Sequence, residues 1–420
     1  MDRPVVVTGV GLVTPLGIGK AAFAENLYAG RSGIGPVTTF DTARLPSHLG
    51  AEARDFDPKD FISVKNRRRM DRLSQMATAS ARMALEDAGF GVRPSNRDRV
   101  GILLGTAFGG TDVAARFVGT LFREGPHRVN PILVPNTVMN APAGHAAIEL
   151  GLRGLNTTVN HREASAETAI AYAAAEIRKG RADVILAGGA DLFSPFFMEI
   201  MTRFKALSPL DDQAEAARPY DRHRNGAILG EGAGLLCLES GEQALARGAI
   251  PYCEIAGWGA SSAPAPPTDW PVDPGGPVLA MQRALAMAGI GPRGIAVVSG
   301  AANGGPRLDR LETDALAAVF ADSHETPWIT SIKGALGESF SSGGIRSAAM
   351  ALSLKDGIVP PTLGLERPMA PLPFAGGDPR RGSLEWGMVN GLASGGTFAA
   401  LVMKRTDGTR RMGVTSDESR

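Results

Sequence analysis

The sequence is short of cysteine, of net charge and of long apolar runs, and each shortage excludes a class of protein. Its two cysteines, Cys237 and Cys253, cannot form a disulfide framework and fit a reducing cytoplasm. A formal net charge of +1 favours neither nucleic acid nor an anionic membrane surface as a partner. No apolar run is long enough for a membrane span, and the opening run, VVVTGVG, is too short for a signal peptide.

Hydrophobic residues and glycine are plentiful instead. With 44% hydrophobic residues and 53 glycines, the chain can bury a large core with many tight turns, as one domain or as two halves around a shared core. Both cysteines lie in apolar, strand-like runs, so we expect buried thiols. Residues 260–276 are predicted to form a Pro-rich surface loop, and residues 406–420 a loose polar tail.

The stretch Leu155–Asp191 has the pattern strand, sharp turn, helix, loop, strand. A helix is predicted over Ala164–Lys179 from apolar residues at helical spacing, and Val184–Leu186 is predicted to be a buried strand. Glu163 lies at the turn, where the first free N–H groups of the helix point outward. Such a turn favours an anionic nucleophile or a bound anion, because the helix dipole stabilises negative charge there.

Strands and helices alternate along the rest of the chain. We expect two βαβαβ halves, residues 1–250 and 251–405, in an α/β fold stacked as α-β-α-β-α layers. Further helices are predicted over residues 66–89, 277–289, 308–320 and 341–354, and strands over residues 4–8, 100–104, 295–299, 328–331, 386–390 and 397–403.

Four segments of the chain resemble motifs of the β-ketoacyl-acyl-carrier-protein synthases, or ketosynthases. They are VVVTGVGLVTPLG, PNTVMNAPAGHAAIELGLRG, the stretch 155–191, and RPYDRHRNGAILGEGAG, which is the most specific match. The resemblance covers nearly the whole chain and implies a thiolase-like fold. His223 and Glu231 lie in the last segment, where structural hydrogen bonds are favoured over catalysis.

The resemblance also implies where the catalytic residues should stand, and three of these positions are changed. The cysteine position is Glu163, and the two histidine positions are Ala301 and Glu338. A carboxylate is a poor acyl acceptor, and neither replacement can donate a hydrogen bond as imidazole does. We therefore expect no condensation by this chain alone. The retained site residues are Lys333, Asp309 and Glu312, and two gate phenylalanines are replaced by Leu392 and Ser394.

Glu163 and Glu338 can share a pocket, where mutual repulsion would raise at least one pKa. We expect Glu163 to be ionised and paired with Lys333 as a plug, with acid–base catalysis by the two carboxyls as the alternative. A nucleophilic Ser165 activated by His161 is weaker, because no nucleophile-elbow glycines flank the serine. Two Glu residues without a nearby His make a poor metal site, and no cofactor is expected.

The pattern is similar to the chain-length factors of type II polyketide systems, which are ketosynthase-like subunits without the cysteine. It implies a non-condensing subunit that pairs with an active ketosynthase and shapes its acyl tunnel, with acyl chains carried on the phosphopantetheine of an acyl carrier protein. The edge strand 156–160 would pair the subunits. A helix predicted to carry Phe108 and Phe117 would close the tunnel, although core packing explains these residues equally well.

Two other functions stay open. One is a stand-alone decarboxylase, acyl-transfer or hydrolytic enzyme that uses Glu163 and Glu338. The other is a homodimeric protein that binds acyl chains. The arginines 67–69 either contact the acidic carrier protein or only solvate a helix end.

Overall fold

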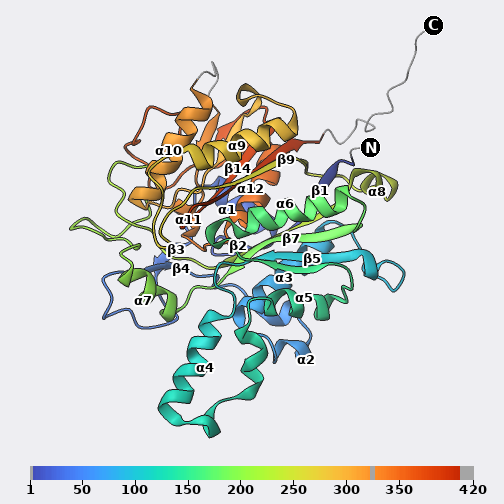
Figure 1. Cartoon of the computed structure of the whole chain (residues 1–420), viewed down its shortest axis with the longest axis vertical. Helices are drawn as coiled ribbons and strands as arrows, with labels where there is room; N and C mark the ends of the chain where they lie inside the picture. Colours follow the sequence, from blue (N-terminus) through green and yellow to red (C-terminus); the bar gives the residue numbers. More distant parts are fainter. Residues whose placement is uncertain (1–2, 322–326, 407–420) are drawn as a thin grey trace.

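The computed structural model describes residues 3–321 and 327–406, and its strands and helices follow one another largely as predicted (Figure 1). Of the predicted tail, residues 407–420 lie outside the described residues. No helix in the described part of the chain is both long enough and apolar enough to cross a membrane.

The first half of the chain forms five neighbouring strands in the order β1-β8-β7-β5-β6. β5, β6 and β7 run parallel to one another, and β8 is antiparallel to both of its neighbours. Their bounds are β1 (Val5–Thr14), β5 (Val100–Gly105), β6 (Asn156–Val159), β7 (Val184–Asp191) and β8 (Gly232–Ser240). β6 stands at the edge, so one side of this strand meets no other strand of the described chain.

The second half continues the same sheet, because β1 also pairs with β9. The strand order from there is β9-β15-β14-β10-β11. These strands are β9 (Cys253–Ser262), β10 (Val297–Ser299), β11 (Trp328–Thr330), β14 (Trp386–Ala393) and β15 (Thr397–Arg405). The two halves therefore repeat one arrangement and are joined in the middle.

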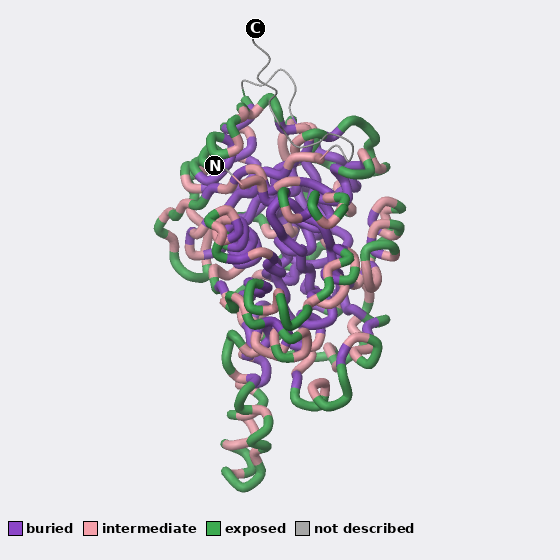
Figure 2. The backbone as a smooth tube through the Cα atoms, turned by 90° about the vertical axis from the view of Figure 1, so that its right-hand side faces the viewer, coloured by how far each residue is buried: buried purple, intermediate pink, exposed green. Residues whose placement is uncertain are grey.

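Two central helices, α6 (Ser165–Arg178) and α12 (Gly343–Asp356), contact strands of both halves. α12 is buried from Gly343 to Leu354, as expected of a helix in an inner layer. Buried residues fill the centre of the molecule in Figure 2. On the outer faces, α3 (Arg72–Asp87) and α5 (Ala141–Leu150) cover the first half, and α9 (Gly275–Ala288) with α10 (Pro306–Phe320) covers the second. This is the predicted five-layer, thiolase-like α/β fold, which is confirmed.

One predicted helix is divided in the structure. The residues expected to form a helix over 66–89 form α2 (Val64–Arg67) and α3, with a break between them. Asp71 causes the second start, because its side chain accepts a hydrogen bond from the Ser74 N–H at 3.1 Å and caps α3. Arg68 and Arg69 are exposed in the break.

A long arm projects from the body of the molecule (Figures 1 and 2). It consists of α4 (Thr111–Glu124) followed by the 3-10 turns η3 (Pro126–Arg128) and η4 (Pro131–Thr137). Phe117 lies on α4, as predicted. Phe108 does not, because α4 begins only after Gly110 and Phe108 sits in the preceding turn.

Candidate functional site

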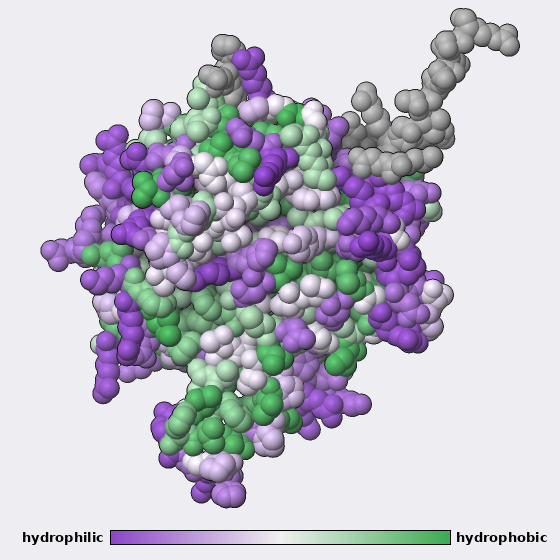
Figure 3. Space-filling view, in the orientation of Figure 1, coloured by the Kyte–Doolittle hydropathy of each residue, from purple (hydrophilic) through white to green (hydrophobic). Residues whose placement is uncertain are grey.

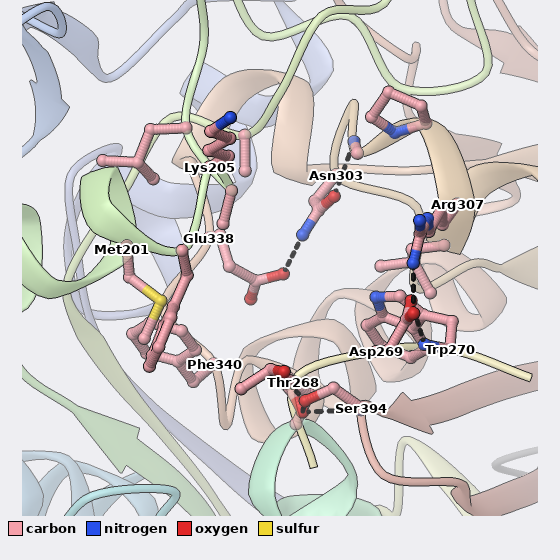
Figure 4. Close-up of a pocket in the computed structure, with 18 of the residues that line it drawn as sticks. Met201, Lys205, Thr268, Asp269, Trp270, Asn303, Arg307, Glu338, Phe340 and Ser394 are labelled. Carbon is pink, nitrogen blue, oxygen red and sulfur yellow. Dashed lines mark hydrogen bonds and ion pairs between the residues drawn. The ribbon is translucent and has the colours of Figure 1, made fainter. Parts of the chain in front are cut away.

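A cavity of about 420 Å³ lies between the two halves, next to the start of α6 (Figure 4). Its mouth is formed by exposed residues that include Lys205 and Arg307, and its floor by buried ones that include Glu338 and Phe340. Other lining residues include Arg162, Glu163, Met201, Leu207, Leu229, Asn303 and Ser394. Polar groups thus lie beside an apolar wall.

Glu163 stands in a 3-10 turn, η5 (Arg162–Ala164), directly before α6. Its carboxyl group accepts hydrogen bonds from Ser394, from the backbone N–H at 3.1 Å and from Oγ at 3.1 and 3.2 Å. Burial raises the pKa of Glu163, while Arg162, with Nε 3.8 Å away, acts in the opposite direction. The position expected to hold the nucleophile is therefore tied to the loop after β14.

Lys333 pairs with Glu338 and not with Glu163, so the predicted Glu163–Lys333 plug is wrong. Lys333 Nζ lies 2.6 Å from Glu338 Oε2, and both side chains are almost fully buried. Asn303 Nδ2 donates to the same oxygen at 2.8 Å. Burial and the nearby Glu338 raise the pKa of Glu163, whereas Arg162 and the Ser394 N–H lower it, so the ionisation of Glu163 stays a prediction. The shared pocket of the two carboxyls is confirmed.

The loop after β10 carries Ala301, whose backbone is held by buried carboxylates. Glu312 accepts hydrogen bonds from the N–H groups of Ala301 and its neighbour at 2.8–2.9 Å, and from the Tyr220 hydroxyl at 2.7 Å. Asp309 accepts from the Asn303 N–H at 3.0 Å and from the Tyr220 N–H at 2.8 Å. Burial raises the pKa of Asp309 to about 7. Both retained carboxylates therefore fix the loop rather than face the cavity.

A second buried ion pair lies behind the cavity, and the sequence did not point to it. Arg346 on α12 donates through Nη2 to Glu167 on α6, and through Nη1 to the Asn390 carbonyl at 2.5 Å and the Gly300 carbonyl at 3.2 Å. Both side chains are at most 1% exposed. Burial raises the pKa of Glu167, and Arg346 counteracts it. The available signal was a single charge in each of two otherwise small or apolar segments, SAETAI and GGIRSA.

The residues expected at the gate and tunnel are dispersed. Phe108 packs behind the cavity wall, with its ring 4.7 Å from that of Phe340 and 4.8 Å from that of Phe197. Phe117 lies on the projecting arm. Ser394 lines the cavity, whereas Leu392 is buried in β14 and is not a lining residue. The structure thus separates Phe108 from Phe117, which the sequence placed on one helix.

The other residues considered for catalysis make hydrogen bonds that hold the structure together. The Ser165 hydroxyl donates to the Arg162 carbonyl at 2.6 Å, and His161 Nδ1 lies 3.3 Å from the Thr168 hydroxyl, so they form no Ser/His pair. Glu231 accepts from Arg72, outside the cavity, and the His223 N–H donates to Asp221. Among the described residues, no three His, Cys, Asp or Glu side chains are placed to hold a metal ion. Both cysteines are buried free thiols, as predicted, and burial raises the pKa of Cys237 to about 12.

Comparison with models of protein families shows to which family the chain belongs. The model of the β-ketoacyl synthase N-terminal domain matches residues 2–244, and that of the C-terminal domain matches residues 252–366. The chain belongs to the β-ketoacyl synthase family. This family membership confirms the resemblance seen in the sequence motifs, and it places the chain among the proteins of fatty-acid and polyketide synthesis.

Relatives in this family match over almost their whole length. The chain is 33% identical to the 3-oxoacyl-[acyl-carrier-protein] synthase 2 of Coxiella burnetii and 34% identical to that of Vibrio cholerae, each over 96% of this chain and 99% of the relative. Among solved structures, the ishigamide ketosynthase/chain length factor superposes with a TM-score of 0.90 at 30% identity, over 97% of this chain and 100% of that one. A type II polyketide ketosynthase in complex with its acyl-carrier protein gives 0.87 at 25% identity, with the same coverage.

Proposed function

We propose that this ketosynthase-family chain is a non-condensing subunit, of the chain-length-factor kind, that pairs with an active ketosynthase and shapes its acyl tunnel. The observation that carries the proposal is the chemistry of the cavity. None of its described lining residues is Cys or His, and a carboxyl group held by Ser394 stands at the start of α6. Without a thiolate the described cavity lining has no acyl acceptor of the ketosynthase kind, and without imidazole it has no such donor for a developing enolate.

A partner subunit is supported by an exposed apolar surface, which we call the arm surface. It is built from α4, η4, α5 and the start of β6, and its arm is largely apolar in Figure 3. Its exposed large apolar residues are Val118, Phe122, Ile132, Val134, Val138, Met139, Ile148 and Leu155. Phe122 is 84% exposed, which is unfavourable unless another protein covers the side chain. The surface continues onto the open edge of β6, where a second sheet can add.

The nature of the partner is supported by the relatives. One similar solved structure is a ketosynthase/chain length factor, and another is a ketosynthase with its acyl-carrier protein. An active ketosynthase with an intact cysteine and two histidines would supply the chemistry that this cavity lacks. The carrier protein would deliver acyl chains on phosphopantetheine to that partner, and exposed Arg68 and Arg69 offer it a positive contact.

The test is co-expression of the tagged chain with a candidate ketosynthase that carries these three residues, followed by co-purification. The Phe122→Asp variant should lose the ketosynthase, because it places a charge in the apolar arm surface. Ile250→Asp is the matched control, since Ile250 is also exposed, at 73%, but lies between α8 (Gly241–Ala246) and β9. A chain that purifies only with itself would refute the heterodimer, and a heterodimer that survives Phe122→Asp would refute the arm surface as its interface.

The stand-alone alternative has one observation in its favour, since Glu163 and Glu338 do line one cavity. Their existing partners weaken it, because Ser394 holds one carboxyl and Lys333 the other. The purified chain, incubated with malonyl-carrier protein and with acyl-carrier protein, should release neither CO₂ nor free acid. Turnover that is abolished by Glu338→Gln would favour the enzyme instead.

A further inference from the structure

Glu338, which lines the cavity, has a polar atom without a hydrogen-bond partner in the described part of the chain. Glu338 is 3% exposed, and its Oε2 takes the hydrogen bonds of both Lys333 and Asn303. Its Oε1 has no hydrogen-bond partner among residues 3–321 and 327–406. Figure 4 shows the carboxyl group reaching into the cavity. A buried carboxylate oxygen without a donor is costly, so it marks a place where a ligand can supply one.

The neighbouring polar groups already make hydrogen bonds to other residues. Both hydrogen-bond donors of Ser394, its N–H and its hydroxyl, are directed at Glu163. The Asn303 side-chain oxygen accepts from the Gly305 N–H at 2.8 Å, and its nitrogen donates to Glu338. None of the hydrogen bonds of the described residues is directed at Glu338 Oε1.

The surroundings restrict the chemistry of the missing donor. The side chains of Met201, Leu207, Leu229 and Phe340 form an apolar wall on which an aliphatic chain can lie. A ligand carboxylate, such as a malonyl group, would be repelled by Glu338 and would bring no donor. An ammonium group is disfavoured as well, because Lys333 already neutralises Glu338. A neutral donor on an apolar chain, which is an aliphatic hydroxyl, fits best.

We propose that this cavity binds a β-hydroxyacyl chain, with the hydroxyl donating to Glu338 Oε1 and the alkyl part against the apolar wall. The site thereby discriminates against the β-oxoacyl group, which has only an acceptor at that position. Glu338 is the residue that determines the specificity. The inference concerns the cavity of this chain and is independent of whether the chain pairs with a ketosynthase.

The experiment compares three thioesters of pantetheine that share one medium-length chain and differ at the β carbon, which carries a hydroxyl, an oxo group or only hydrogens. Binding to the purified full chain is measured by calorimetry, and intact mass checks that no thioester reacts. The hydroxyl form should bind about tenfold more tightly than the oxo form, as expected for one hydrogen bond to a charged acceptor. Equal binding, tighter binding of the oxo form, or no binding of any thioester would overturn the proposal.

A substitution of Glu338 tests whether its Oε1 atom accepts the hydrogen bond of the ligand. In Glu338→Gln the amide oxygen should keep the donors Lys333 and Asn303, which turns the NH₂ group toward the ligand. The preference should then invert, so that the oxo form binds more tightly than the hydroxyl form. Glu231→Gln is the matched control, because Glu231 is an equally buried ion-paired glutamate outside the cavity. An unchanged preference in folded Glu338→Gln, or an inverted one in Glu231→Gln, would contradict the assignment.

Discussion

Replacing Arg346 by methionine should destabilise the fold strongly, because it leaves the carboxyl of Glu167 buried without a counter-charge. Arg346 also donates to three backbone carbonyls, those of Ser299, Gly300 and Asn390, so its loss loosens the loop that leads to the cavity. Removing one member of a buried pair costs about 3–5 kcal/mol. Domains are stable by about 5–15 kcal/mol, so the loss is a large part of the total.

The cost should depend on pH, with a sign that follows from the pKa of Glu167. Burial already raises this pKa in the folded chain, and losing Arg346 removes the main opposing influence. A group whose pKa is higher in the folded than in the unfolded state stabilises the fold below its unfolded pKa, and this contribution is lost as pH rises through the folded pKa. The Arg346→Met penalty should therefore grow from acidic toward neutral and basic pH, by at most about 1.4 kcal/mol per unit.

Urea unfolding at about pH 5 and about pH 8 measures both effects. Glu167→Gln with Arg346→Met is the informative control, because it has no buried ionisable group at this place and should lose the added pH dependence. At the higher pH the double variant should be more stable than Arg346→Met alone. An Arg346→Met chain within about 1 kcal/mol of the parent, or a penalty that does not change with pH, would refute the argument from buried charge.

Three further predictions concern the site and the tunnel. The purified chain should form no acyl adduct with acyl-carrier protein, and a stable adduct seen by intact mass would contradict this. Glu163→Gln should keep its Ser394 hydrogen bonds and assemble normally. Its stability should fall less than that of the parent as pH rises, because burial raises the pKa of the native carboxyl. Loss of all product from an assembled Glu163→Gln complex would instead indicate chemistry at Glu163. In a co-expressed complex, Phe108→Ala and Phe117→Ala should each lengthen the product. Phe108→Ala should also cost up to about 3–5 kcal/mol of stability, because Phe108 packs against Phe340. Unchanged product length would argue against a gate role.

The fold was predictable because its signals are local and repeated. Buried strands such as β7 and amphipathic helices such as α3 are visible as apolar runs and helical spacing within a few residues. Boundaries were less predictable, since they depend on single side chains. The Asp71 cap divides one predicted helix into two, and the turn at Phe108 moves the start of α4 beyond that residue.

The position of the candidate site was predictable from the sequence, but the ion pairs between its residues were not. Sequence motifs brought Glu163, Glu338 and Ser394 to one cavity, as the structure does. Lys333 pairs with Glu338, five residues along the chain, and not with the distant Glu163, and this choice depends on a few ångströms of side-chain placement. No spacing rule contains that information. The same reason explains why the ion pair of Glu167 and Arg346, which are 179 residues apart, was missed.

Under the proposed function, replacing the cysteine and histidine positions leaves the scaffold around them intact, and the hydrogen bonds of the loop after β10 show why. The backbone at Ala301 is held by Glu312, and the next turn by Asp309, both from α10. These bonds use main-chain N–H groups, so they form whichever side chain residue 301 carries. At the start of α6, the Glu163 carboxyl is likewise tied to Ser394, on the loop after β14. The loops around the cavity are thus anchored by main-chain N–H groups and buried carboxyl groups, so under the proposed function the cavity keeps its shape without the cysteine and the two histidines.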